Sequence, residues 1–241
     1  MAKRPLPGKC VHCLKDSVER NWDHVFPAAW YPKSTKQDVY KWQIPSCIPC
    51  NSEYGKLETD FLVRVALCLD PHELASSSVV EAALRSMRAS AGRSPRDSLL
   101  RAARARKIIG ETLQGAAIPN HGVFPGMEEK WGRPIEEQVA ILIPAKSFRR
   151  IAEKIVRGIF FIKEKRFIEP PYEIEFFALH ENAAGPMKQV LDKFGTTYAL
   201  EPGIVVRRAV APEDDISSLF YIEFWRQMKL YASVTNTKQG L

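Results

Sequence analysis

The sequence of 241 residues lacks any apolar run close to the roughly 20 residues that a membrane-spanning helix needs. Its first residues, Met1-Ala2-Lys3-Arg4-Pro5, contain no apolar stretch like that of a secretory signal. It also contains no Gly-x-Gly-x-x-Gly and no Gly-x-x-x-x-Gly-Lys-Ser/Thr loop, which argues against chemistry driven by a bound nucleotide. These absences predict a cytoplasmic protein without a membrane partner.

Repeats and low-complexity tracts are absent as well, which argues against a solenoid and against a long disordered linker. Hydrophobic residues make up 45% of the chain and charged residues 26%, values that are ordinary for a folded globular protein. The length is sufficient for one large domain or two small ones.

The positive charge is concentrated in two blocks. The formal net charge is +7. Residues 85 to 107 contain eight basic residues and one acid, and residues 146 to 166 contain eight basic residues and two acids. A charge run is usually a solvated face, but two such blocks favour a polyanion as partner. The residues expected to contact nucleic acid are Lys56, Arg101, Arg104, Arg150, Lys154 and Arg157.

The pattern divides the chain into three segments: a zinc-binding domain over 1–70, a basic helical segment over 71–118 and an α+β domain over 119–241. The first segment has little apolar periodicity, so a metal must supply much of its stability. A short helix is predicted over 58–69. In the second segment we predict a helix that Ser77 or Ser78 caps and that ends at Met87, and a longer one from Ser94-Pro95 to about 115, because serine caps helices and proline suits their first turn.

The third segment predicts strands over 138–143, 172–180, 204–210 and 220–234, and helices over 145–166 and 184–194. In the helix over 145–166, apolar residues recur at steps of three and four from Phe148 to Ile162. This spacing places Arg150, Lys154 and Arg157 on the opposite, outward face. Together the elements indicate the α+β class.

Four of the five cysteines form two Cys-x-x-Cys pairs, Cys10/Cys13 and Cys47/Cys50. Each pair can present two sulfurs to one tetrahedral ion, and in a reducing compartment such pairs more often hold metal than form disulfides. We therefore expect a structural Zn²⁺. The pairs are separated by 33 residues, more than the roughly 15 to 20 of a compact zinc ribbon. His12, inside the first pair, is expected to be solvated.

The insertion between the pairs contains Asp23-His24-Val25-Phe26-Pro27, and the second pair continues into Asn51, with Gly55-Lys56 beyond it. This order of elements resembles the HNH endonuclease family in its zinc-bound form. The resemblance covers roughly the first sixty residues. It implies a ββα-metal fold, in which a two-stranded ribbon and a helix surround one catalytic divalent ion and four cysteines pin the ends.

The resemblance also implies roles for individual residues. His24 would be the general base that takes a proton from the attacking water, a task that suits imidazole because its reference pKa lies near 6.5. Asp23 and Asn51 would hold a catalytic Mg²⁺ or Mn²⁺, which prefers oxygen ligands. Lys56 would neutralise a nearby phosphate.

One position departs from the family pattern. The middle asparagine, which helps to orient the histidine-bearing loop, corresponds to Trp42 here, flanked by Lys41 and Gln43. Gln43 takes that role if the register slips by one residue; otherwise the base is less well oriented.

Structural roles for the same residues stay open. Asp23 and His24 can form a purely structural pair, and Asn51 can cap a helix that begins after Glu53. The aromatic residues of this region are expected to pack the small zinc domain, although one of them can stack on a base: Trp22, Trp30, Tyr31, Tyr40 and Trp42.

The sequence therefore predicts an enzyme, a metal-dependent endonuclease that hydrolyses phosphodiester bonds, with double-stranded DNA as the expected partner. Two alternatives are a non-catalytic zinc module that binds nucleic acid and a zinc-stapled protein-interaction module. The choice between DNA and RNA, the oligomeric state, a regulatory protein partner and the role of residues 119–241 stay open.

Overall fold

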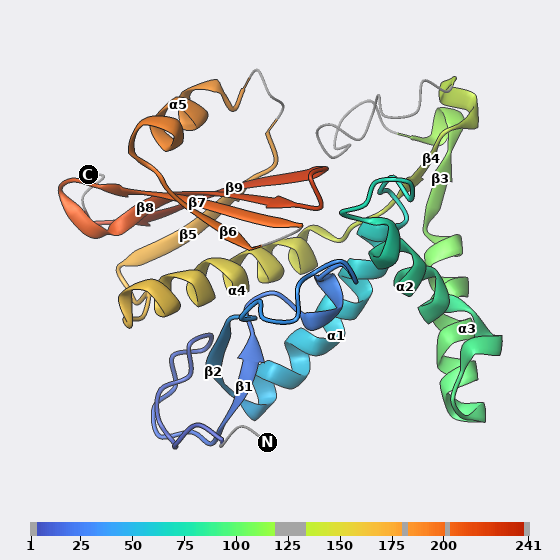
Figure 1. The fold of residues 1–241 in the computed structure, drawn as a ribbon, viewed down its shortest axis with the longest axis horizontal. Helices are drawn as coiled ribbons and strands as arrows, with labels where there is room; N and C mark the ends of the chain where they lie inside the picture. The colour runs from blue at the N-terminus through green and yellow to red at the C-terminus, as the bar shows by residue number, and fades with distance from the viewer. Residues whose placement is uncertain (1–3, 119–133, 180–182, 201–202, 239–241) are drawn as a thin grey trace.

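The computed structural model describes residues 4–118, 134–179, 183–200 and 203–238, and these form a mixed α+β protein (Figure 1). The helices are α1 (Ile48–Ala66), α2 (Ser77–Met87), α3 (Pro95–Gly110), α4 (Ala145–Glu164) and α5 (Gly185–Phe194). Two small antiparallel sheets pair β1 (Arg20–His24) with β2 (Gln43–Cys47) and β3 (Thr112–Gln114) with β4 (Val139–Ile141). The largest sheet contains β5 (Tyr172–Phe177), β6 (Thr196–Leu200), β7 (Ile204–Ala211), β8 (Asp214–Phe224) and β9 (Met228–Asn236).

The five-stranded sheet is antiparallel, in the order β5-β9-β8-β7-β6, and lies between two helices. Figure 1 shows α4 along one face of the sheet and α5 on the other. Successive side chains of β8 point to opposite faces of the sheet. Phe220, Ile222 and Phe224 therefore lie on one face, where they are buried in the core that includes α4. On the other face, Leu191 of α5 packs with Tyr231 of β9 in a smaller cluster.

Helix α4 is buried on two sides, because it lies between the large sheet and the layer formed by β1, β2 and α1 (Figure 1). Ile155 and Phe160 belong to the core. Gly158 allows the close approach to the β1–β2 pair, since a Cβ atom at this position would lie 2.7 Å from Val25 Cγ2 and 3.3 Å from Ile44 Cδ1.

A single hydrophobic core includes residues from all three segments distinguished in the sequence. The Phe26 and Phe224 rings lie 6.0 Å apart, and those of Trp30 and Trp225 lie 5.9 Å apart. The Trp225 indole N–H also donates to the Trp30 carbonyl oxygen at 2.8 Å. The boundaries near residues 70 and 118 therefore separate stretches of sequence, but they do not separate hydrophobic cores.

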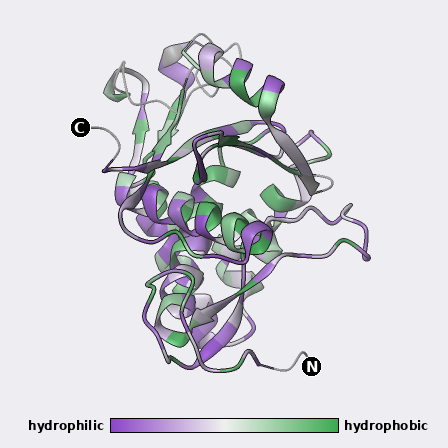
Figure 2. Cartoon of the chain, turned by 90° about the vertical axis from the view of Figure 1, so that its left-hand side faces the viewer, coloured by the Kyte–Doolittle hydropathy of each residue, from purple (hydrophilic) through white to green (hydrophobic). Residues whose placement is uncertain are grey.

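The described helices alternate polar and apolar residues along their length, as Figure 2 shows by hydropathy. None of the helices in the described part of the chain has the length and apolar character required to cross a membrane.

Several predicted elements are confirmed and others are wrong in extent. Helix α2 ends at Met87 as predicted, but it begins at Ser77 after the N-cap Ser76, so Ser77 and Ser78 are not its caps. Ser94 caps α3 as predicted by accepting a hydrogen bond from the Asp97 N–H, and α3 ends at Gly110, before the predicted end near 115. The helix predicted over 58–69 is α1, which begins ten residues earlier, at Ile48, because Pro49 suits a first helical turn. The strand predicted over 220–234 is two strands, since Trp225 and Arg226 adopt positive φ values of 50° and 57° in a turn between them.

Candidate metal centre and the histidine beside it

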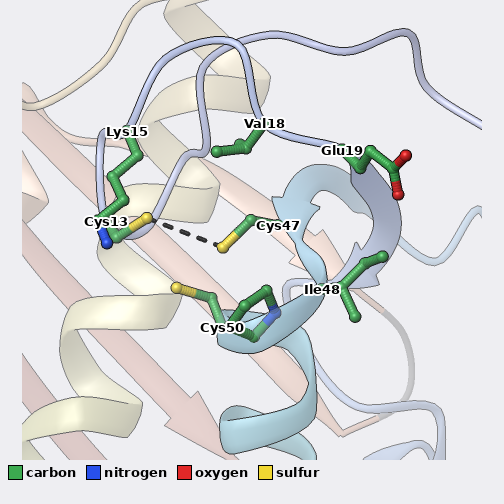
Figure 3. Close-up of a pocket in the computed structure, with 8 residues that line it drawn as sticks. Cys13, Lys15, Val18, Glu19, Cys47, Ile48 and Cys50 are labelled. Atoms are coloured by element: carbon green, nitrogen blue, oxygen red, sulfur yellow. Dashed lines mark hydrogen bonds between the residues drawn. The ribbon is translucent and has the colours of Figure 1, made fainter.

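Cys10, Cys13, Cys47 and Cys50 converge on one point, and their four sulfur atoms all lie within 4.8 Å of one another. The Cys13 and Cys47 sulfurs are 3.8 Å apart (Figure 3). Two sulfurs on a tetrahedral zinc, each at about 2.3 Å from the ion, would be separated by roughly the same distance. The predicted four-cysteine cluster is therefore confirmed as a group that can hold a metal such as zinc.

Two different local structures supply the pairs. Cys10 and Cys13 lie in a tight turn in which the Leu14 N–H donates to the Cys10 carbonyl at 3.0 Å. Leu14 has a positive φ of 62°. Cys47 ends β2, and Cys50 lies in the first turn of α1. Because strand and helix join directly at Cys47, the second pair is rigid.

Backbone hydrogen bonds lower the pKa values of the cysteine thiols, whereas burial raises them. Burial raises the pKa of Cys10, but N–H groups that include that of Cys47, 3.2 Å from the Cys10 sulfur, bring it to about 7. Burial raises the pKa of Cys50, and neighbouring thiols raise it further. Four thiolates this close need a cation between them, as zinc provides.

Asp23 is buried, with 5% of its surface exposed, and both of its carboxylate oxygens are hydrogen-bonded. His12 Nε2 lies 2.9 Å from Oδ2, and the Lys154 ammonium donates to Oδ1 at 2.8 Å. Lys154 also pairs with Glu58 of α1. Burial raises the pKa of Asp23, but the bonds to His12 and Lys154 outweigh it, so the pKa lies below its usual value.

The predicted exposure of His12 and of Lys154 is wrong. His12 was expected to be solvated, but only 8% of it is exposed and its ring lies 4.5 Å from that of Tyr54. Lys154 was expected on an outward basic face, but only 1% of it is exposed. Apolar periodicity identifies the side of α4 that faces the large sheet, whereas α1 and β1 cover the other side. Lys154 is therefore an internal counter-ion and is not available to bind nucleic acid.

The other predicted nucleic-acid contacts differ in their availability. Arg150 pairs with Glu53 at 3.1 Å, and Arg157 donates to the Ile168 carbonyl at 2.6 Å. Arg101 and Arg104 donate to the carbonyls of Arg85 and Ser86 near the end of α2, and Arg101 also pairs with Asp97. Both arginines thus join α3 to α2, whereas Lys56 is exposed on α1.

His24 is half-buried and lies opposite Gln43 in the β1–β2 pair. The Gln43 side-chain amide donates to His24 Nε2 at 3.0 Å. Gln43, and not the buried Trp42, therefore faces the histidine. Burial is the main cause that lowers the pKa of His24, with Lys154 and Lys41 acting in the same direction, so the imidazole is neutral near pH 7.

Asn51 lies inside α1, four residues beyond its N-cap Cys47, so its proposed capping role is wrong. Its side-chain amide donates to the Trp22 carbonyl of β1 at 3.3 Å. This bond brings α1 against the strand that carries Asp23 and His24. Those two residues are consecutive, so their side chains leave opposite faces of β1. Within the described residues, no hydrogen bond joins any two of the three side chains.

The sequence analysis missed Glu58 of this region, and it did not foresee the burial of His12. Glu58 shares a helix face with Asn51 and Tyr54, but this is visible only when α1 begins at Ile48. The burial of His12 carries no signal in the sequence, because it depends on packing against Tyr54.

Comparison of the chain with models of protein families, with curated proteins and with solved structures finds no match in any of the three.

Proposed function

We propose that the protein is a metal-dependent endonuclease that hydrolyses phosphodiester bonds in DNA, with His24 as the general base. The observation that carries the proposal is the pair formed by His24 and Gln43, 3.0 Å apart at the end of a two-stranded ribbon that continues into α1. In this arrangement Nε2 accepts from the Gln43 amide and the neutral ring carries its proton on Nδ1. A turn of that amide, which places its oxygen against an Nε2–H, leaves Nδ1 free to accept a proton from water.

The donor atoms of this region fit two different metals. The four sulfurs of the cysteine cluster suit zinc, whereas the oxygens of Asp23 and Asn51 suit Mg²⁺ or Mn²⁺. Such an ion, when bound, would polarise the phosphodiester and stabilise the leaving oxygen. Because soft and hard donors are separated, the two metals would not exchange sites readily.

The position of Asp23 in this structure does not fit an ion shared with His24. An ionised carboxylate has about four lone-pair sites, and His12 and Lys154 use one on each oxygen. The carboxylate is only 5% exposed, lies against the Lys154 ammonium and leaves the opposite face of β1 from His24. A metal-binding role for Asp23 therefore requires its side chain to turn from this position.

Incubation of the zinc-loaded protein with supercoiled plasmid, with and without added Mg²⁺ or Mn²⁺, tests the proposal. We expect nicking only with the added ion, and its loss in His24→Ala with the zinc content unchanged. His72→Ala is the matched control, because His72 is exposed in the loop between α1 and α2. Cleavage that persists in His24→Ala, or no cleavage by the wild type with either ion, rejects the proposal.

A second candidate is a zinc module that binds nucleic acid without cutting it. The observation that favours it is the burial of Asp23 with both oxygens already bonded. It predicts salt-sensitive DNA binding that His24→Ala leaves unchanged, and no nicking. A protein-interaction module would instead show no appreciable affinity for duplex DNA near physiological salt, since it lacks phosphate contacts and the counterion release that accompanies them.

A further inference from the structure

Burial separates the aromatic residues of the cysteine-rich segment, any of which the sequence allowed to stack on a base. Trp30, Tyr31 and Trp42 are at most 8% exposed and belong to the core. Tyr40 is 68% exposed, but it lies in the loop between β1 and β2. Trp22 is 40% exposed and lies within β1. Exposure alone does not mark a binding site, since single apolar side chains are common on protein surfaces, so the position of Trp22 decides.

Trp22 shares a strand face with His24. One residue separates them in β1, so their side chains leave the same face, with Cα atoms about 6.5 Å apart. Across the ribbon, Trp22 lies opposite Pro45, and His24 lies opposite Gln43. Asp23, between them, leaves the other face, toward α4. The indole and the proposed base are therefore neighbours on one side of the ribbon.

The backbone of Trp22 is fixed by contacts from two elements. Its strand pairs with β2, and the side-chain amide of Asn51 in α1 donates to the Trp22 carbonyl oxygen at 3.3 Å. Because β2 continues directly into α1 at Cys47, the ribbon and the helix are joined as one unit. The indole is thus presented from a rigid backbone, which reduces the conformational freedom lost when a ligand binds.

We infer that Trp22 stacks on a nucleobase of the strand whose phosphodiester lies at His24, so that the substrate is DNA with unpaired bases beside the scissile bond. The inference rests on the proposed function and narrows its substrate. A base reaches an aromatic side chain only after it leaves the duplex stack, and a single strand offers such bases without that cost. An indole face accepts every base, so the contact adds affinity without reading sequence.

The test measures binding of the full-length, zinc-loaded protein to two labelled single-stranded oligodeoxynucleotides of equal length, without added Mg²⁺ or Mn²⁺. One carries ordinary bases and the other is abasic throughout, so both present the same phosphates. Trp22→Ala should bind the base-bearing strand roughly fivefold to 100-fold more weakly than the wild type does, and the abasic strand equally well. Binding to a fully paired duplex should be unaffected.

Two further substitutions separate stacking from packing. Trp22→Phe should retain most of the affinity for the base-bearing strand, because a phenyl ring still stacks. Trp22→Leu keeps an apolar side chain opposite Pro45 but offers no aromatic face, so it should bind as weakly as Trp22→Ala. Phe194→Ala is the matched control, since Phe194 is also exposed but ends α5, on the other face of the large sheet. Zinc content and thermal unfolding verify that each variant is folded.

An equal loss on the base-bearing and abasic strands, or affinities of Trp22→Ala that match those of Phe194→Ala, would overturn the inference. An equal loss on the paired duplex would contradict the unpaired substrate. If plasmid nicking is absent while Trp22→Ala shows the expected loss, the nuclease proposal fails and the stacking contact is supported. Nicking that depends on His24, combined with unchanged strand binding by Trp22→Ala, rejects the stacking contact alone.

Discussion

Lys154 and Asp23 form an ion pair with 2.8 Å between nitrogen and oxygen, although 131 residues separate them in the sequence. Lys154 is supplied by α4, and Asp23 belongs to the β1 strand. Both are buried, with 1% and 5% of their surfaces exposed. The carboxylate next to the proposed base is therefore held by a residue far outside the cysteine-rich segment.

Replacement of Lys154 by methionine should strongly destabilise the protein. The change leaves Asp23 and Glu58 in the interior without their shared counter-ion, and loss of one partner of a buried pair typically lowers the free energy of unfolding by about 3–5 kcal/mol. Urea denaturation measures the change. Lys146→Met, at an exposed position of the same helix, should change it by less than about 0.5 kcal/mol. Equal effects of the two substitutions would contradict this account.

Two glycine-to-alanine substitutions should act in opposite directions. In Gly158→Ala the new methyl group overlaps Val25, 2.7 Å away, and should destabilise the fold by about 1–3 kcal/mol. In Gly55→Ala the methyl group has no neighbour within 4 Å in the middle of α1. Alanine is the better helix former there and should stabilise by up to about 1 kcal/mol. Thermal melts of both variants measure whether stability rises or falls. A stabilising Gly158→Ala would show that α4 and the β1–β2 pair are not in close contact.

Metal analysis of the purified protein should find one zinc per chain, bound by the four cysteines. Cys47→Ser should lose most of the zinc, because a hydroxyl is a poor substitute for a thiolate ligand. Removal of zinc by a chelator should unfold the turn around Cys10 first. Cys68→Ser is the control, since Cys68 lies at the end of α1 outside the cluster. Full zinc content in Cys47→Ser would exclude the four-sulfur site.

Gln43→Ala should slow DNA cleavage about 10-fold to 100-fold if the proposed function is right, because the amide that orients His24 is removed. The effect should appear in kcat, with the affinity for duplex DNA unchanged. Gln37→Ala, at an exposed position in the loop before β2, is the matched control. A Gln43→Ala variant that cleaves at the wild-type rate would show that the pairing with His24 has no catalytic role.

The sequence predicts most accurately where short-range chemistry decides. The Cys-x-x-Cys spacing predicts the four-cysteine cluster, and Ser94-Pro95 marks the true start of α3. The α+β class is also predicted correctly, because hydrophobic periodicity is a local property of each element.

Long-range packing explains what the sequence did not reveal. Periodicity in α4 shows one apolar face, but it cannot show that Lys154 lies on a second face covered by α1 and β1. The burial of His12 depends in the same way on Tyr54. The pairing of His24 with Gln43 depends on a register that the 18 residues between β1 and β2 leave undetermined in the sequence.

The hydrogen bond from Trp225 to the Trp30 carbonyl limits how this protein can be divided. Phe26 and Trp30, both 1% exposed or less, lie against residues near the end of β8. An excised cysteine-rich fragment would turn these rings toward water and would also lose the ammonium beside Asp23. A fragment meant to fold by itself in a fusion protein should therefore extend from the first cysteine pair through β9.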